Sequence, residues 1–198
     1  KYLSLIELNF SYRFLFIPET IGSITWLNKN EKKLDKIKHG LVVTCVGDSG
    51  RFTYKKTRQG NAEIDKIVTS ILKNSNSDYD VVDFFPFGSD ERQFCSPGFN
   101  LPIGSLTRTR YGNFPEYHTS ADNLEFVKKE SLSDSFLKYL SVIFTIENNK
   151  TYNTKSDEHD ARQHSQKSKG TYYINLNPKC EPHLSKYDLY KSIGDGSN

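Results

Sequence analysis

The sequence predicts an α/β fold, a three-layer α/β/α sandwich built around a mostly parallel mixed sheet. Patterns typical of strands and of helices alternate along the chain from residue 11 to residue 146. The segment 41–46 has a continuous apolar strand pattern, as in strands that helices cover on both faces. Repeated β-α-β order with strands of this kind favours a largely parallel sheet.

Residues 1–46 predict two helices and two strands. Residues 1–8 look like a helix already in progress, since no N-cap residue precedes them. The aromatic and apolar run 11–17 predicts a strand. The remaining elements are a helix over residues 20–37, which ends at His39-Gly40, and the strand 41–46.

Residues 51–146 predict three further strands and three helices. Residues 62–72 place five apolar side chains at i, i+3, i+4, i+7 and i+8, the spacing of an amphipathic helix. Thr119 and Asp122 have the spacing of a capping box, which predicts a helix start directly after His118. The other elements are a short exposed strand over 51–57, strands over 79–85 and 101–107, and a closing helix over 132–146.

Length and charge bound the class of protein. The 198 residues are enough for one substantial core. The formal net charge is +3 with acids and bases interspersed, so we expect no nucleic-acid partner. No apolar run approaches the roughly 20 residues that span a bilayer, and no signal-peptide pattern opens the chain. We therefore expect no membrane partner and a cytoplasmic location.

Composition divides the chain into three regions. Residues 1–147 form the predicted α/β domain, residues 148–170 predict a polar flexible insertion or linker, and residues 171–198 predict a strand and a tail leading to another module. The absence of methionine and the helix in progress at residue 1 suggest a piece of a longer protein, without the N-terminal part of the domain. His159 and His164 lie near acidic residues in the polar segment, where chance is the stronger explanation for such a cluster.

The three cysteines, Cys45, Cys95 and Cys180, are scattered singly. This spacing argues against a disulfide framework and against a cysteine zinc site. Cys45 lies inside an apolar strand pattern, so we expect it to be a small buried core residue.

Polar side chains gather where predicted strands end. Glu19, the pair Gly47-Asp48 and the pair Ser89-Asp90 each follow a strand, and such loops should meet at one edge of the sheet. His118 stands just before a predicted helix start, and a fixed backbone suits a metal ligand. The residues alone leave a second interpretation open, in which His118 is a turn histidine and Asp122 only caps a helix.

Several motifs occur together in a fixed order. They are Phe16-Ile-Pro-Glu19-Thr20-Ile-Gly22, Thr44-Cys-Val-Gly-Asp48, Gly88-Ser-Asp-Glu-Arg-Gln-Phe94, Tyr117-His118-Thr-Ser-Ala-Asp122 and Asn177-Pro-Lys-Cys-Glu-Pro182. In these motifs the chain resembles bacterial zinc aminopeptidases of the di-zinc exopeptidase clan. The resemblance is strongest to a less characterised aminopeptidase-like branch that is associated with polysaccharide biosynthesis.

The resemblance implies a zinc-exopeptidase-like fold and hydrolysis of an amide bond in a small peptide or another amide-bearing substrate. It assigns Glu19 as the general base that activates metal-bound water, and His118 as a zinc ligand. The side chains expected to bind substrate or to orient their neighbours are Asp90, Arg92, Tyr117 and Asp122.

Two departures from the family pattern weaken the metal site. Thr20 and Thr44 stand where the family has zinc-binding carboxylates, and hydroxyls are poor zinc ligands. The family's upstream ligand motifs are also absent from this chain, so one zinc ion is expected rather than two. A catalytically degenerate binding or scaffold domain is the alternative function, and a homo-oligomer is possible. The peptidase interpretation requires Glu19 and His118 to face one shared cleft.

Overall fold

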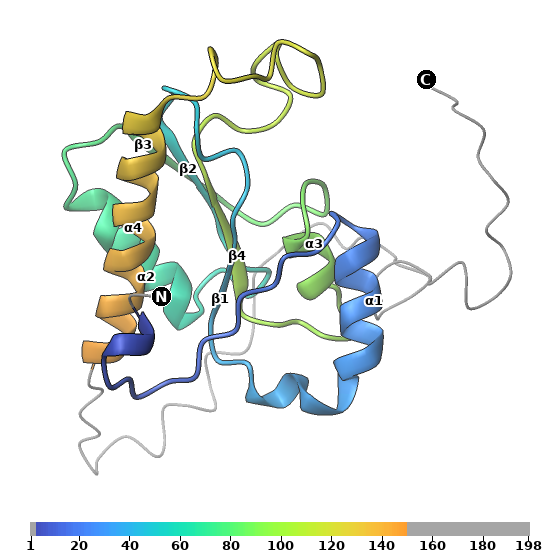
Figure 1. Ribbon diagram of the computed structural model, residues 1–198. Coiled ribbons are helices and arrows are strands. Elements are labelled where there is room, and N and C mark those ends of the chain that lie inside the picture. Colours follow the sequence, from blue (N-terminus) through green and yellow to red (C-terminus); the bar gives the residue numbers. More distant parts are fainter. Residues whose placement is uncertain (1–2, 150–198) are drawn as a thin grey trace, which may run out of the picture.

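The structure is a computed structural model that describes residues 3–149 (Figure 1). The elements, in order, are a 3-10 turn over Leu3–Leu5, α1 (Ile21–Asn30), a 3-10 helix over Glu31–Lys36, β1 (Gly40–Val42), β2 (Phe52–Lys55), α2 (Glu63–Lys73), β3 (Tyr79–Val82), α3 (Glu91–Phe94), β4 (Ile103–Thr107) and α4 (Lys129–Asn148). The predicted regions beyond residue 149, with His159, His164 and Cys180, lie outside the described residues.

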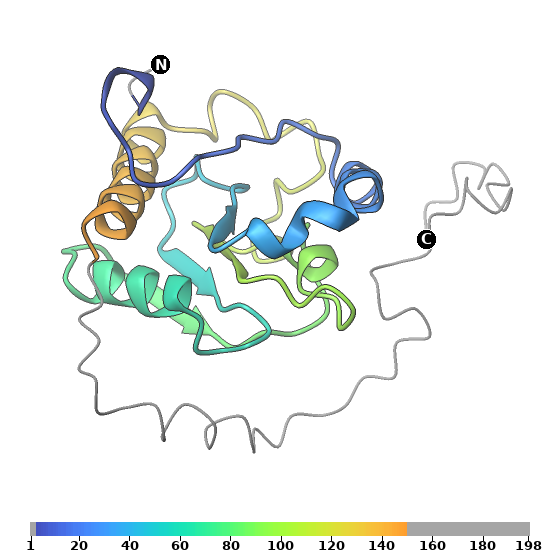
Figure 2. The same cartoon turned by 90° about the horizontal axis from the view of Figure 1, so that it is seen from below.

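The four strands form one mixed sheet in the order β1-β4-β2-β3. β1 runs parallel to β4, and β2 runs parallel to β3, whereas β2 and β4 are antiparallel. Figure 2 shows α2 and α4 on one face of this sheet and α1 and α3 on the other. The predicted three-layer α/β sandwich with a mostly parallel mixed sheet is therefore confirmed.

Each face of the sheet has its own apolar core. On the α2 and α4 face the buried side chains include Phe52, Tyr54, Ile64, Val68, Leu72, Leu106 and Val142. On the α1 and α3 face they include Ile24, Leu27, Leu34, Phe94, Leu101 and Ile103. Two separate cores explain why helices flank both sides of so small a sheet, since each sheet face must be shielded from water.

A buried carboxylate fixes the start of α2. Asp65 accepts hydrogen bonds from Ala62 N at 2.9 Å, Thr57 N at 2.8 Å, Thr57 Oγ1 at 2.6 Å and Tyr54 Oη at 2.8 Å. Burial and the Asp65 carboxylate both raise the pKa of Tyr54, which keeps its hydroxyl a donor. Asp65 thus ties the first turn of α2 to the end of β2 and to the loop between them.

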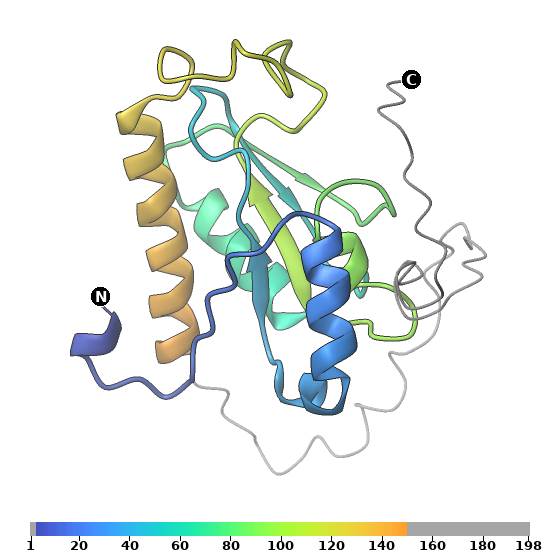
Figure 3. The same ribbon diagram turned by 45° about the vertical axis from the view of Figure 1, so that its right-hand side comes forward.

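The predicted strand over residues 11–17 is wrong. The segment leads from the first 3-10 turn to α1 without joining the sheet (Figure 3), and it is assigned no strand. Its two phenylalanine side chains lie in solvent, with Phe14 63% and Phe16 94% exposed. Aromatic composition favours a strand only where a neighbouring strand completes the hydrogen-bond ladder, and within residues 3–149 no strand pairs with this segment.

Other predicted elements differ in extent or type. β1 ends at Val42, four residues early, and Cys45 beyond it has a left-handed backbone with φ 47°. β2 is buried at every position instead of exposed, since β4 and β3 flank it on both edges. The described residues 3–8 hold only a 3-10 turn in place of a helix, and the short helix α3 was missed.

The capping box predicted at residues 119–122 is also absent. Thr119 Oγ1 donates to Glu116 O at 2.8 Å and accepts from Ala121 N at 3.2 Å, which makes a turn, and the next helix begins at Lys129. Threonine hydroxyls stabilise turns and helix caps by the same kind of bond, so the sequence pattern could not distinguish them. Within residues 3–149, no helix combines the length and the apolar character needed to cross a bilayer.

Candidate functional site

One cavity of about 390 Å³ contains Glu19 and His118, which lie far apart in the sequence. It opens where the turn before α1, the loop after β1 and the long loop before α4 meet. The lining side chains are Glu19, Thr44, Cys45, Val46, Gly47, Asp48, Phe114, Tyr117, His118, Asp122, Phe126, Val127 and Leu132. The requirement that Glu19 and His118 share a cleft is therefore met, and Tyr117 and Asp122 belong to the same cavity.

Asp90 holds the turn that presents Glu19. Its Oδ1 accepts hydrogen bonds from Thr20 N at 2.7 Å and from Ser23 Oγ at 2.9 Å. Ser23 Oγ also donates to Thr20 O at 2.8 Å, and Arg92 Nη2 donates to Thr20 Oγ1 at 3.4 Å. Asp90 and Arg92 are not among the cavity-lining residues, so the structure places both behind Glu19, in contact with its neighbour Thr20.

Gly22 lets the chain turn tightly into α1. A Cβ atom at this position would lie 2.8 Å from Ile17 Cβ and 3.0 Å from Pro18 Cδ. Gly22 N donates to Pro18 O at 3.0 Å, which closes the turn around Glu19. The spacing of proline, Glu19 and glycine in this motif thus has a steric reason.

We expect Gly22→Ala to destabilise the protein by about 1–3 kcal/mol, because the methyl group must displace Ile17 and Pro18. Helix propensity alone would give the opposite sign, since alanine in a helix is favoured over glycine by about 1 kcal/mol. Urea unfolding of the two proteins measures the difference. If Gly22→Ala is more stable than the wild type, the close approach to Ile17 and Pro18 does not determine the stability of this turn.

An aromatic cluster supports the His118 side of the cavity. The Tyr117 and His118 rings stack with centroids 3.9 Å apart at 17°. Phe114 packs edge-on against Tyr117 at 5.5 Å and stacks on Phe126 at 5.3 Å. Burial raises the pKa of Tyr117, with further contributions from Glu19 and Cys45, so the phenol remains a hydrogen-bond donor.

Cys45 lies in the cavity wall and is not the core residue that the sequence suggests. Its thiol is half-buried, and Thr44 Oγ1 lies 3.7 Å from its sulfur. Burial raises the pKa of Cys45, and the carboxylates of Asp48, Glu19 and Asp122 raise it further. The thiol therefore stays protonated at neutral pH and is a weak nucleophile. The sequence gives no sign that the backbone is left-handed at Cys45, so the pattern could not place this residue in the cavity wall.

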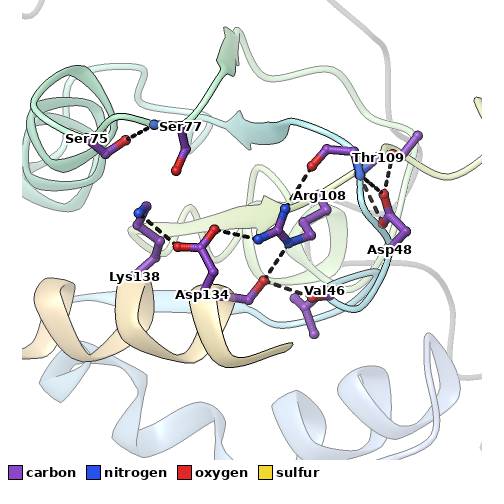
Figure 4. Close-up of polar contacts among 10 residues, drawn as sticks. Val46, Asp48, Ser75, Ser77, Arg108, Thr109, Asp134 and Lys138 are labelled. Atoms are coloured by element: carbon purple, nitrogen blue, oxygen red, sulfur yellow. Dashed lines mark hydrogen bonds and ion pairs between the residues drawn. The ribbon is translucent and has the colours of Figure 1, made fainter. Parts of the chain in front are cut away.

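A buried arginine network fixes the loop after β1 next to Val46 (Figure 4). Arg108 donates to Ser135 Oγ at 3.0 Å, to Gly50 O at 2.9 Å and to Asp134 Oδ2 at 2.5 Å. Ser135 Oγ donates in turn to Val46 O at 2.8 Å. The network joins the loop after β1 to α4, so this loop is rigidly attached to the fold.

Asp48 acts from the same loop. It is 4% exposed and accepts hydrogen bonds from Gly50 N at 2.7 Å and from both the backbone N–H and the hydroxyl of Thr109. These bonds engage its oxygens within the protein. Although Asp48 lines the cavity, its contacts indicate that it holds the loops after β1 and β4 together.

Four non-glycine residues in the described part of the chain have a left-handed backbone: Thr20, Cys45, Asn100 and His118. Cys45 and His118 line the cavity, and Thr20 adjoins Glu19. Such conformations cost about 1–3 kcal/mol each and concentrate at functional sites. Strained backbone at three places around one cavity favours a functional role for it.

A buried ion pair fixes the motif Gly88–Phe94 to β2. Lys55 Nζ lies 2.8 Å from Glu91 Oε1, and these side chains are 5% and 1% exposed. The Lys55 ammonium also lies 3.9 Å from the Phe85 ring centroid and donates to Phe87 O. This pair, which sequence analysis missed, fixes the segment from which Asp90 and Arg92 extend.

The donor set does not fit a complete zinc site. Within residues 3–149, no group of three or more His, Cys, Asp or Glu side chains is placed to hold a metal ion. A catalytic zinc ion needs three protein ligands. Thr44 lines the cavity with a hydroxyl-bearing side chain, and hydroxyls are poor zinc ligands. His118 is the one imidazole among the residues that line this cavity.

Comparison with solved structures places the fold among peptidases. A crystal structure described as a "putative peptidase" from Clostridium acetobutylicum superposes with a TM-score of 0.74 at 53% identity, covering 98% of this chain and 43% of that one. An aminopeptidase from Aneurinibacillus sp. strain AM-1 gives a TM-score of 0.52 at 16% identity, over 64% of this chain and 30% of that one. This second similarity concerns the fold alone.

Sequence comparison also finds a relative whose name refers to an aminopeptidase-like domain. A C. acetobutylicum protein named "Putative polysaccharide biosynthesis protein with aminopeptidase-like domain" is 56% identical over all 198 residues. The chain spans 41% of the length of that relative. A family model described as a domain of unknown function, DUF4910, matches residues 1–149. Because this match extends over most of the sequence, the chain belongs to the DUF4910 family.

Proposed function

We propose that the cavity hydrolyses an amide bond, with Glu19 as the group that accepts a proton from the attacking water and delivers it to the leaving nitrogen. One observation carries the proposal: Glu19 and His118 line the same cavity although separate elements supply them. The names of the relatives support a peptidase-like reaction, and one of them links such a domain to polysaccharide biosynthesis. The substrate would be a small peptide or another amide-bearing molecule.

The chain's own residues have distinct tasks in this proposal. The carboxylate of Glu19 holds the proton in transit, while Asp90, Ser23 and Arg92 fix the turn that carries it. Tyr117, with its raised pKa, is a donor for a substrate oxygen at the cavity wall. Asp122, which lines the same cavity, would accept a hydrogen bond from the substrate.

We further propose that His118 supplies one ligand of a single zinc ion. The described residues do not form the rest of that site, so other ligands would have to come from elsewhere in the full-length protein. When bound, zinc supplies Lewis-acid polarisation and lowers the pKa of water. Elemental analysis tests this separately from activity. We expect zinc near one per chain in the full-length protein and its loss in His118→Ala, and retention of zinc by that variant would contradict it.

The test of hydrolysis is Glu19→Gln in the full-length protein. We expect cleavage of aminoacyl anilides or N-acylated sugars to fall roughly 10²- to 10⁴-fold, because glutamine cannot accept the proton. Glu125→Gln is the matched control, since Glu125 is exposed in the long loop before α4 but does not line the cavity. Equal activity in Glu19→Gln and the control would exclude Glu19 as the base.

A second function has specific support. Thr44 presents a hydroxyl to the cavity in place of a carboxylate, as expected of a domain that binds but no longer hydrolyses its ligand. This binding or scaffold function predicts that the wild-type protein cleaves no amide and holds no zinc. It predicts ligand binding at the same cavity, which calorimetric titration measures.

A further inference from the structure

The cavity has one aromatic wall. Phe114, Tyr117 and Phe126 line it together with Val127 and Leu132. The Phe114 and Phe126 rings are stacked at 21°, and Tyr117 meets Phe114 edge-on at 78°. All three side chains are half-buried, and all three line the cavity. The result is a continuous apolar surface on the side of the long loop before α4.

The remaining polar side chains of the lining offer mainly hydrogen-bond acceptors. Glu19 and Asp122 contribute exposed carboxylates, and Thr44 contributes a hydroxyl. Neither carboxylate forms an ion pair with a lysine or arginine within residues 3–149, in contrast to Asp83, which pairs with Lys56 at 2.9 Å. Their lone pairs are therefore available to a ligand, and as long as no cation is bound at His118 the two charges disfavour an anionic one.

A sugar ring has the same two kinds of surface. One face of a pyranose presents mainly C–H groups, and its rim presents hydroxyls. The C–H face suits the aromatic wall of Phe114, Tyr117 and Phe126, while the rim hydroxyls suit the acceptors on Glu19 and Asp122. An ammonium on the ring would add charge-assisted hydrogen bonds to these carboxylates. A volume of about 390 Å³ lies within the range of small-molecule sites.

We propose that this cavity binds an amino sugar, which is the carbohydrate part of an amide-bearing substrate. The inference rests on the proposed function only in that it assigns a substrate class to the same cavity. Binding itself does not require hydrolysis. A hydrolysed N-acyl group would leave a free amine on the sugar, so the product would carry the ammonium that Glu19 and Asp122 attract.

Calorimetric titration of the full-length protein, as purified and after a zinc chelator, tests the ligand class, and the charge preference is expected in the zinc-free protein. The probes are glucosamine, N-acetylglucosamine, glucuronate and leucinamide, which represent a cationic, a neutral and an anionic sugar and an apolar amine without a ring. We expect glucosamine to bind roughly tenfold or more tightly than glucuronate, with N-acetylglucosamine between them. Leucinamide should bind more weakly than glucosamine. Tighter binding of leucinamide, or no binding of either amino sugar, would overturn the proposal.

Two variants assign the binding to this cavity. Asp122→Asn should remove most of the advantage of glucosamine over N-acetylglucosamine, because it deletes one charge facing the ammonium. Asp83→Asn is its control, since Asp83 is exposed and lies outside the cavity. Phe126→Leu should weaken both sugars by a similar factor. An unchanged affinity in both Asp122→Asn and Phe126→Leu would show that sugars bind elsewhere and would refute the assignment.

The outcomes separate this inference from the proposed function. In Glu19→Gln the side-chain amide oxygen still accepts a hydrogen bond, so N-acetylglucosamine should bind more weakly but measurably while amide cleavage is lost. Sugar binding without any cleavage in the wild-type protein would support the amino-sugar site and contradict the hydrolase. Cleavage of aminoacyl anilides without sugar binding would support the hydrolase and contradict the amino-sugar site.

Discussion

Lys55→Met should lower the free energy of unfolding by about 3–5 kcal/mol, because it leaves the Glu91 carboxylate buried without its counter-charge. Methionine fills a similar volume, so the loss comes mainly from the charge. Glu91 is 1% exposed, and its Oε2 has no hydrogen-bond partner within the described residues. Urea unfolding measures the change in the free energy of unfolding, provided that the slope m is the same in both proteins.

The neighbouring residue provides a matched control for this substitution. Lys56 also forms an ion pair, with Asp83 at 2.9 Å, but Asp83 is 88% exposed. Lys56→Met should therefore cost less than about 1 kcal/mol. The double variant Lys55→Met with Glu91→Gln should recover part of the stability, since no unpaired charge remains. If Lys55→Met costs no more than Lys56→Met, the buried pair does not anchor the motif.

Asp65→Ala should destabilise the protein by about 3–5 kcal/mol, because four hydrogen-bond donors lose their acceptor at once. These donors are Tyr54 Oη, Thr57 N, Thr57 Oγ1 and Ala62 N. Asp65 is 3% exposed, so water cannot replace the carboxylate without rearrangement of α2. Thermal and urea unfolding both measure the loss.

Two variants define how that loss is distributed. Tyr54→Phe removes one donor and keeps the other three satisfied, so it should cost only about 1 kcal/mol. Asp35→Ala changes an exposed aspartate in the 3-10 helix after α1 and should lie within about 0.5 kcal/mol of wild type. An Asp65→Ala protein as stable as Asp35→Ala would mean that the network is dispensable.

The parts of the fold that could be predicted from sequence depend on local signals. The helix α2 was predicted within one residue at each end because its apolar spacing is carried by its own side chains. The segment 11–17 has equally strong local composition, but whether it forms a strand depends on a partner elsewhere in the chain. The helix start predicted at Thr119 was wrong for another reason, because a threonine hydroxyl forms the same kind of hydrogen bond in turns and in helix caps.

The candidate site shows the same division. The motifs around Glu19 and His118 predicted a shared cleft, and the structure places both side chains in one cavity. Cys45 was misplaced because its position depends on the point at which β1 ends. Lys55 was overlooked because a lysine in a predicted exposed strand gives no sign that its ammonium is buried. Pairings between distant segments determine both of these features.

The three left-handed residues around the cavity have a consequence for how this surface tolerates change. Glycine would occupy each of these backbone conformations without steric cost, so a chain selected only to fold would gain stability from it. Threonine, cysteine and histidine at these positions instead concentrate local frustration at one place. Stabilising substitutions should accordingly be found here more readily than in the two cores, and they should be the ones that disturb ligand binding.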